Sequence, residues 1–299
     1  MKVICNNLQT TNRISKYQKP IMEPTTPTAD KESSEVEELK SQITALKSQL
    51  AAAKSQASQI PPLAPPPHLW LLLADSALPI GSFAFSSGLE SYISHRSLRP
   101  VTGKPTPKME LIRFLRLSLL SVSTTTVPFI AAAFRDPSGV MEVDDVFDSS
   151  TTCEVARRAS ISQGRALCSV WDKSFAASLL DTRGCGGLPT GFRPEHFGPA
   201  WGYITRLCGV EGTDGGVEMV GFVFLFNHVK ALLSAAVRLS LIGPYVAQQV
   251  LASEEVVGLV KAAVGRGVGI PVEEAGQSVP TVDLWQGRHE RLYTRIFNS

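Results

Sequence analysis

Apolar residues recur mostly three and four positions apart from His68 onward, and turn-forming residues separate these stretches. No stretch alternates between apolar and polar side chains in the way that predicts a half-buried strand. The pattern therefore predicts an all-α protein. We expect a single multi-helix bundle domain over residues 68–280, followed by a docking tail over residues 281–299.

The first long helix is predicted from its start signals. Thr106 followed by Pro107 is a favourable N-cap and first-turn pair, and Pro128 should end the helix or restart it. The helix would turn a wide apolar face to the core. That face comprises Met109, Leu111, Ile112, Leu115, Leu119 and Leu120.

Further helices follow towards the C-terminus. Thr151 and Glu154 match a capping box that would open the next helix, and residues 194–208 indicate another. Residues 217–241 are apolar almost all round, as in a helix buried at the centre of a bundle, and residues 246–264 supply one or two more. The glycine-rich stretch 184–191 between two of these helices predicts a surface loop.

The N-terminal extension, residues 1–67, differs in composition from the rest of the chain, because Thr, Ser, Lys, Gln and Pro dominate it. We expect it to be largely disordered, with a Pro-rich linker over residues 60–67. A short heptad helix is predicted at about residues 34–58, as a coiled coil or as a solitary helix. Its seam comprises Val36, Leu39, Ile43, Leu46, Leu50, Ala53 and Ala57.

Composition narrows the functional classes. The 299 residues are 43% hydrophobic and carry a formal net charge of +2, which indicates neither a nucleic-acid nor a membrane partner. Five cysteines without a C-x-x-C pair fit a reducing compartment. We expect a cytoplasmic protein without a transmembrane helix, and an organelle transit peptide at the basic N-terminus is the alternative.

No motif of the chain predicts catalysis. Gly265–Gly269 is the nearest match to a phosphate-binding turn, but it follows a helix and is better explained as a chain reversal. Ser86 and Ser87 lack the glycine register of a nucleophile elbow. The five histidines are scattered, so we expect no permanently bound cofactor or metal. An enzyme that used His289 and Glu290 as acid and base would lack a nucleophile.

Two segments suggest protein contact. In the stretch from Leu78 to Glu90, Pro79 and Gly81 break a helix, and Ser82 is placed to cap the next one. At the C-terminus, basic and aromatic residues gather without a clear period, so we expect a tail ordered by docking. Near the end of the most apolar helix, Arg238 either bonds local carbonyls or an acid, or contacts a partner.

These residues carry a resemblance to the urease accessory protein UreF. It extends over roughly residues 68–299 and includes the stretch from Leu71 to Glu90, Ser162–Leu167 and Phe197–Gly202. It also includes Arg238 with Gln248, and it is most specific at the C-terminal tail. The resemblance implies that partner-binding positions are Gly81, Ser82, Phe83, Ser86, Gly88, Glu90, Arg238, Gln248, Arg288, His289, Glu290, Tyr293, Arg295 and Phe297.

The resemblance also implies a function. A UreF-like homodimer would bridge the accessory protein UreD (also called UreH) and the GTPase UreG, and so support nickel insertion into apo-urease. Nickel would be handled by the complex, and the chain itself would not be an enzyme. The alternative is a factor that regulates UreG by supplying an arginine, with Arg238 as the candidate, to its GTPase site in trans.

Overall fold

A computed structural model describes residues 37–50, 67–96, 106–176, 193–210 and 214–298. The chain divides into two units, residues 1–62 and residues 63–299. Within the first unit, residues 37–50 form a helix in which every residue is exposed. The rest of the predicted heptad stretch, the Pro-rich linker up to residue 66 and the loop over residues 184–191 lie outside the described residues. Pro67, predicted as the end of the linker, is the first residue of a helix.

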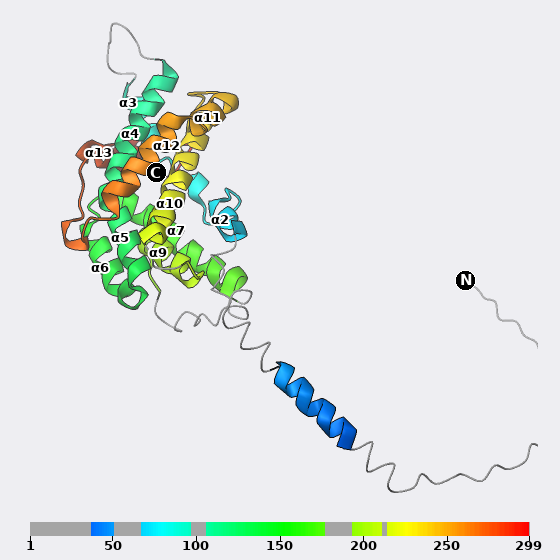
Figure 1. Ribbon diagram of the computed structural model, residues 1–299. Helices are drawn as coiled ribbons and strands as arrows, with labels where there is room; N and C mark the ends of the chain where they lie inside the picture. The colour runs from blue at the N-terminus through cyan, green and yellow to red at the C-terminus, as the bar shows by residue number, and fades with distance from the viewer. Residues whose placement is uncertain (1–36, 51–66, 97–105, 177–192, 211–213, 299) are drawn as a thin grey trace, which may run out of the picture. The chain divides into compact units, whose positions relative to one another are not determined.

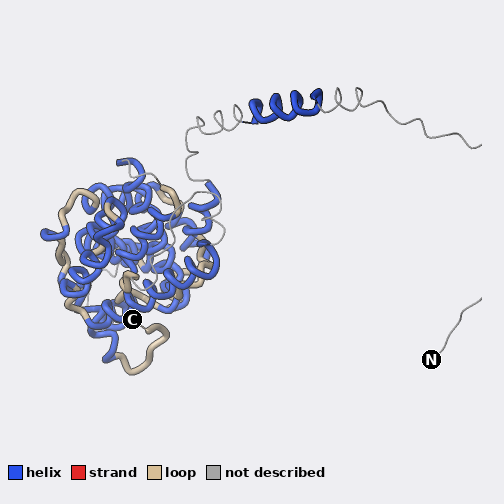
Figure 2. Tube along the Cα trace, turned by 90° about the horizontal axis from the view of Figure 1, so that it is seen from below, coloured by secondary structure: helices blue, strands red, loops and turns tan. Residues whose placement is uncertain are grey.

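The second unit is an all-α bundle, and its described residues contain no strand (Figures 1 and 2). The elements are, in chain order, α2 (Pro67–Ala74), η1 (Ser82–Ala84), α3 (Leu89–Arg96), α4 (Pro107–Thr125), α5 (Val127–Arg135), η2 (Pro137–Gly139), α6 (Val140–Ser150), α7 (Glu154–Val170), η3 (Trp171–Phe175), α9 (Phe197–Leu207), α10 (Asp214–Arg238), α11 (Pro244–Leu251), α12 (Glu254–Gly267), η4 (Val272–Glu274), α13 (Pro280–Arg288) and η5 (His289–Arg291). The predicted fold class is therefore confirmed.

Helix α10 forms the centre of the bundle, as its apolar sequence predicts. It packs against α2, α4, α5, α9, α11 and α12, and α12 lies beside it in Figure 1. The indole of Trp201 on α9 is fully buried and donates a 3.2 Å hydrogen bond to the carbonyl of Val220. The central helix is thereby tied to its neighbour by a polar bond as well as by packing.

Two stretches, Pro107–Arg135 and Gly215–Arg238, are apolar and long enough to cross a membrane. The first is not one continuous helix, because α4 ends at Thr125 and α5 begins at Val127. The interruption at Thr126 lies two residues before Pro128, which is in the first turn of α5, so the predicted restart at this proline is confirmed. Most of the apolar window of each stretch is buried inside the bundle, as in the core helices of soluble proteins.

Helix starts were predicted with mixed success. The hydroxyl of Thr106 accepts a 3.3 Å hydrogen bond from the amide of Met109, so the predicted N-cap of α4 is confirmed. The Met109 side chain, however, is exposed rather than packed in the core. The capping box at Thr151 is wrong, because that hydroxyl donates back to the carbonyl of Phe147, and Cys153 occupies the N-cap of α7.

The C-terminal part of the bundle also differs from the prediction. The stretch 265–269 predicts a chain reversal, but its first three residues still belong to α12, which continues to Gly267, and only residues 268–269 form a turn. A Cβ atom on Gly267 would overlap the carbonyl oxygen of Ser123 and the side chain of Val127, so glycine lets α12 lie directly on the junction between α4 and α5. The tail, which showed no clear period, begins with a helix, α13.

Candidate functional site

The segment between α2 and α3 forms a sharp turn because two glycines adopt positive φ angles. Gly81 has a φ of 73° and Gly88 a φ of 85°, conformations that other residues rarely adopt. Ser82 does not cap a helix as predicted, because its hydroxyl donates a 3.0 Å hydrogen bond to the side chain of Gln163. Instead, the hydroxyl of Ser86 accepts from the amide of Glu90 at the start of α3.

Helix α13 packs directly against this turn. A Cβ atom on Gly88 would lie 3.1 Å from Cγ of Gln286 and 3.4 Å from Cβ of Trp285, so the absent side chain gives α13 room. The ring of Trp285 lies 4.7 Å from the ring of Tyr92 and 5.8 Å from that of Phe114. An aromatic cluster therefore holds α13 on α3 and α4.

The carboxylate of Glu90 holds the rest of the tail. It is 4% exposed, and its Oε2 lies 2.7 Å from Nε2 of the fully buried His289. The same carboxylate accepts hydrogen bonds from two backbone amides, that of Ile296 at 2.8 Å and that of Phe297 at 3.2 Å. A buried carboxylate needs such donors, since an unpaired one would be strongly destabilising. We call Glu90 and these three partners the tail lock.

Arg238 adds a second attachment at the end of α10. Its guanidinium donates to the carbonyl of Phe83 and lies 4.1 Å above the ring of Phe297. The amide of Asn298 donates a 2.8 Å hydrogen bond to the carbonyl of Ala84 nearby. Arg238 thus bonds a carbonyl of its own chain, one of the two roles predicted for it, and it remains exposed.

The tail of this chain therefore folds back on its own domain, and the predicted partner-binding residues separate into two groups. Those that lie in or beneath the tail attachment are buried: Ser86, Gly88, Glu90, His289 and Phe297. Those that face outward are exposed: Phe83, Arg238, Gln248, Arg288, Glu290, Tyr293 and Arg295. Gly81 and Ser82 are half-buried. The buried group cannot touch a partner while the tail is docked.

The exposed group is not gathered in one place. Glu290 forms an ion pair with Arg158 on α7, and Gln248 lies on α11. In contrast, Phe83 is bonded to Arg238 at the edge of the tail, and Tyr293 protrudes from the tail itself. The sequence prediction missed Ile296, which is 62% exposed although its amide belongs to the tail lock. We call Phe83, Arg238, Tyr293, Arg295 and Ile296 the tail surface.

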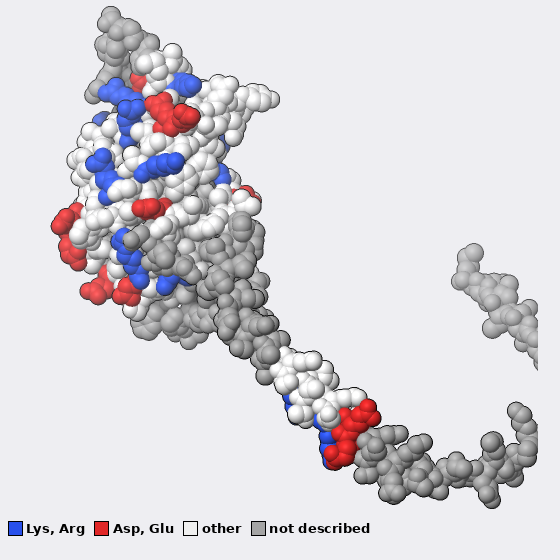
Figure 3. All heavy atoms as spheres, viewed as in Figure 1, with Lys and Arg blue, Asp and Glu red and all other residues white. Residues whose placement is uncertain are grey.

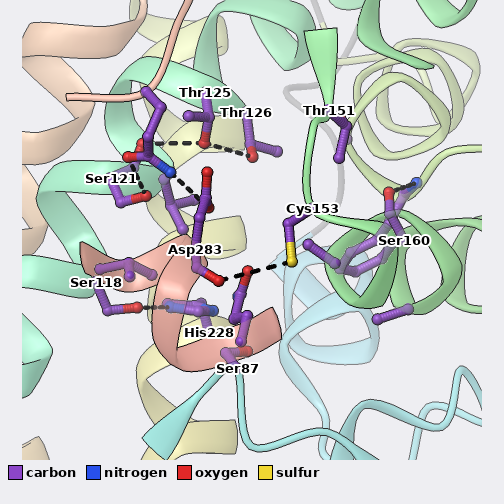
Figure 4. A pocket seen from close by; sticks show the side chains of 18 of the residues that line it. Ser87, Ser118, Ser121, Thr125, Thr126, Thr151, Cys153, Ser160, His228 and Asp283 are labelled. Carbon is purple, nitrogen blue, oxygen red and sulfur yellow. Dashed lines mark hydrogen bonds between the residues drawn. The ribbon is translucent and has the colours of Figure 1, made fainter. Parts of the chain in front are cut away.

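A cavity of about 320 Å³ lies beneath α13, and hydroxyl groups line much of it. Figure 4 shows Ser118 bonded to His228 on one wall and Cys153 bonded to the backbone of Asp283 on another. The Ser118 hydroxyl lies 2.8 Å from Nε2 of His228, the spacing of a nucleophile and its base. The pair had not been predicted, because the two residues come from separate helices, α4 and α10.

The protonation equilibria of these groups do not favour catalysis. Burial lowers the pKa of His228 to about 4, so the imidazole is a weak base near neutral pH. Burial also raises the pKa of the Cys153 thiol, which disfavours its thiolate. Burial raises the pKa of Asp283 despite its hydrogen bond from Gln277. The cavity thus lacks an activated nucleophile among its described residues.

Metal-ligating side chains do not cluster in the parts of the chain that the structure describes. No group of three His, Cys, Asp or Glu residues is placed to hold an ion there. His289 is oriented towards Glu90, and its Nδ1 has no hydrogen-bond partner among the described residues. Its complete burial leaves the imidazole inaccessible from solvent while the tail is docked.

Comparison with known proteins places this bundle in a family. A family model described as UreF matches residues 106–254. An uncharacterized UreF-like urease accessory protein of Schizosaccharomyces pombe is 36% identical over 239 residues, which cover 78% of this chain and 97% of that protein.

Plant proteins are also similar. Urease accessory protein F of Oryza sativa subsp. indica is 34% identical over 234 residues, covering 76% of this chain and 83% of the relative. Urease accessory protein F of Arabidopsis thaliana is 29% identical over 236 residues, covering 77% and 91%. With an all-α fold, a matching family model and relatives matched over most of their length, the chain belongs to the UreF family of urease accessory proteins.

Proposed function

We propose that this protein is a non-catalytic scaffold of urease maturation, which works as a homodimer in the cytoplasm. It would bind a UreD (UreH) accessory protein and the GTPase UreG, and so support nickel insertion into apo-urease. Nickel is then the cargo of the assembled complex rather than a resident cofactor of this chain. Membership in an accessory-protein family supports the general role.

The tail surface is the observation that carries this proposal. Tyr293 is fully exposed, and Phe83 and Ile296 are 65% and 62% exposed although the backbone of these two is hydrogen-bonded to the domain. Exposed aromatic and aliphatic side chains beside arginines are the composition of protein interface cores. The tail lock already fixes the backbone of the tail. Binding a partner would therefore cost little further conformational entropy.

Binding assays with homologues of UreD and UreG test the proposal. In the full chain, Tyr293→Ala combined with Ile296→Ser should weaken binding of the UreD homologue by about 30-fold or more, since a single interface hot spot contributes about 2 kcal/mol. Met219→Ala is the matched control. Met219 is an exposed apolar residue on the same bundle, and it lies about 28 Å from Arg238 along α10. Unchanged affinity in the double variant, with the fold intact, would contradict the proposal.

The alternative role, an arginine supplied to UreG in trans, is less well supported. The guanidinium of Arg238 is already bonded to Phe83 and stacked on Phe297, so insertion into a partner's site would break both contacts. We expect Arg238→Ala to weaken complex formation while leaving GTP turnover per assembled complex unchanged. A loss of turnover in complexes that still assemble would favour the alternative instead, because an arginine finger accelerates hydrolysis by about 10³-fold or more.

A further inference from the structure

The helix over residues 37–50 carries an apolar seam that none of the described residues covers. Leu39, Ile43, Leu46 and Leu50 are between 50% and 63% exposed, at spacings of four, three and four residues. Such a seam repeats every 3.5 residues on average and stays on one side of a gently supercoiled helix. Full burial of each side chain would contribute about 1.5–3 kcal/mol to the free energy of association, so binding of the seam to another apolar surface is strongly favoured.

We propose that this helix pairs with the same helix of a second copy of the chain, in a parallel, in-register, two-stranded coiled coil. Ile43 and Leu50 occupy the a positions of the heptad, and Leu39 and Leu46 occupy the d positions. Ile43 is β-branched whereas Leu50 is not, and within parallel coils a β-branched residue at a combined with leucine at d favours two strands over three or four. The preceding a position, outside the described residues, is also β-branched, since it is Val36.

Charges beside the seam select the orientation. Lys40 and Lys47 occupy e positions, and Gln42 and Gln49 occupy g positions. In a parallel pair each e residue faces a g residue of the other helix, so every lysine meets a glutamine. In an antiparallel pair e faces e, so lysines would face lysines, and like charges destabilise. Figure 3 shows the acidic residues of this helix gathered at one end.

An ion pair within each helix is compatible with this arrangement. Lys40 lies 3.3 Å from Glu37, which occupies the b position away from the seam. The side chains of both residues are largely exposed, so the pair contributes little and does not compete with coiling. The seam, rather than the surface charges, therefore supplies the stability.

A coil of about two heptads is weak on its own, so its effect depends on linkage to the bundle domain. If the domains also associate, pairing of the two helices becomes intramolecular, and avidity rises without any new contact on the bundle. The extension would then tether two copies of the scaffold. This inference does not depend on the proposed function, because it concerns the purified chain alone.

Disulfide cross-linking in the full chain tests the pairing, in a Cys5→Ser background that removes the cysteine of the same unit. Leu39→Cys and Leu46→Cys, assayed separately, should each give cross-linked dimers in a glutathione buffer, because identical d positions face each other in a parallel pair. The matched control is Ser48→Cys at the outward f position. We expect at least about tenfold less cross-linked dimer in the control, whose sulfur atoms are too far apart.

A second substitution distinguishes pairing of this helix from association of the bundle domains. Adding Ile43→Asp to the Leu46→Cys variant should abolish cross-linking even if the domains remain associated, because it buries a charge in the seam. The proposal is overturned if Ser48→Cys cross-links equally or if Ile43→Asp has no effect. It is also overturned if Ile43→Cys and Leu46→Cys chains join each other in preference to themselves, which indicates antiparallel pairing, because an a position then faces a d position of the other helix. Absence of cross-linking at both seam positions likewise overturns the proposal.

Discussion

Two contacts of the bundle domain are built on different principles. Helices α5 and α9 approach so closely that a Cβ atom on Gly202 would overlap the carbonyl oxygen of Ile130. The tail is instead held by one carboxylate, Glu90, which binds His289 and two backbone amides. The first contact depends on shape and the second on a few polar bonds. We therefore expect the core to unfold cooperatively and the tail to detach by local unfolding.

The largest effect is expected where α5 meets α9. Gly202→Ala would force the two backbones apart, and such overpacking should lower the free energy of unfolding by about 3 kcal/mol or more. Urea denaturation of the full chain measures this change. Gly258→Ala on the exposed side of α12 is the control, because nothing lies within 4 Å of its Cβ position. That change should stabilise the helix by about 0.5–1 kcal/mol. Equal effects at the two sites would refute the role assigned to close approach.

The next-largest expected effect is a loss of stability at low pH, caused by a buried histidine in the core of the bundle. Burial lowers the pKa of His228 to about 4 from its ordinary value of 6.5, so the unfolded chain binds this proton more tightly than the folded one. The free energy of unfolding therefore keeps its full value above pH 6.5. It decreases as the pH falls towards 4, by about 3 kcal/mol in total.

Denaturation midpoints measured across this pH range check that sign. His228→Gln keeps an acceptor for Ser118 but does not titrate, so its stability should fall much less between pH 6.5 and 4 than that of the unsubstituted chain. Parallel pH profiles for the two proteins would show that His228 does not contribute the loss.

A smaller, local effect is expected at the tail lock. Glu90→Gln removes the charge and one of the two acceptor oxygens, so amide hydrogens of Ile296 and Phe297 should exchange about 10–100 times faster. The unfolding midpoint of the bundle should change little. Exchange rates measured by mass spectrometry resolve the tail from the core. Global destabilisation with no preferential change in the tail would contradict a separate lock.

The smallest effect serves as the control for that experiment. Glu290 is next to His289 in sequence, yet its carboxylate is exposed and pairs with Arg158. Exposed ion pairs contribute about 0–1 kcal/mol, so Glu290→Gln should leave tail exchange nearly unchanged. A large effect here would mean that surface charge, and not the buried carboxylate, holds the tail.

The sequence by itself determined the all-α class, the start of α4 at Thr106 and the burial of α10, because each depends on local spacing and capping chemistry. It also identified both ends of the tail lock, through Glu90 and His289, without indicating that they meet. Helix α13 escaped prediction because its apolar residues are few and serve contacts with α3 and α4 rather than a periodic face.

Only the tertiary structure decided which candidate residues are buried and which are exposed. Glu90 and His289 are 199 positions apart, and their hydrogen bond exists because Gly88 lets α13 lie against the turn. The pairing of Ser118 with His228 and the close contact at Gly202 likewise depend on which helices become neighbours. Spacing along a chain specifies the face of a helix, whereas the partner of that face is set by packing of the whole bundle.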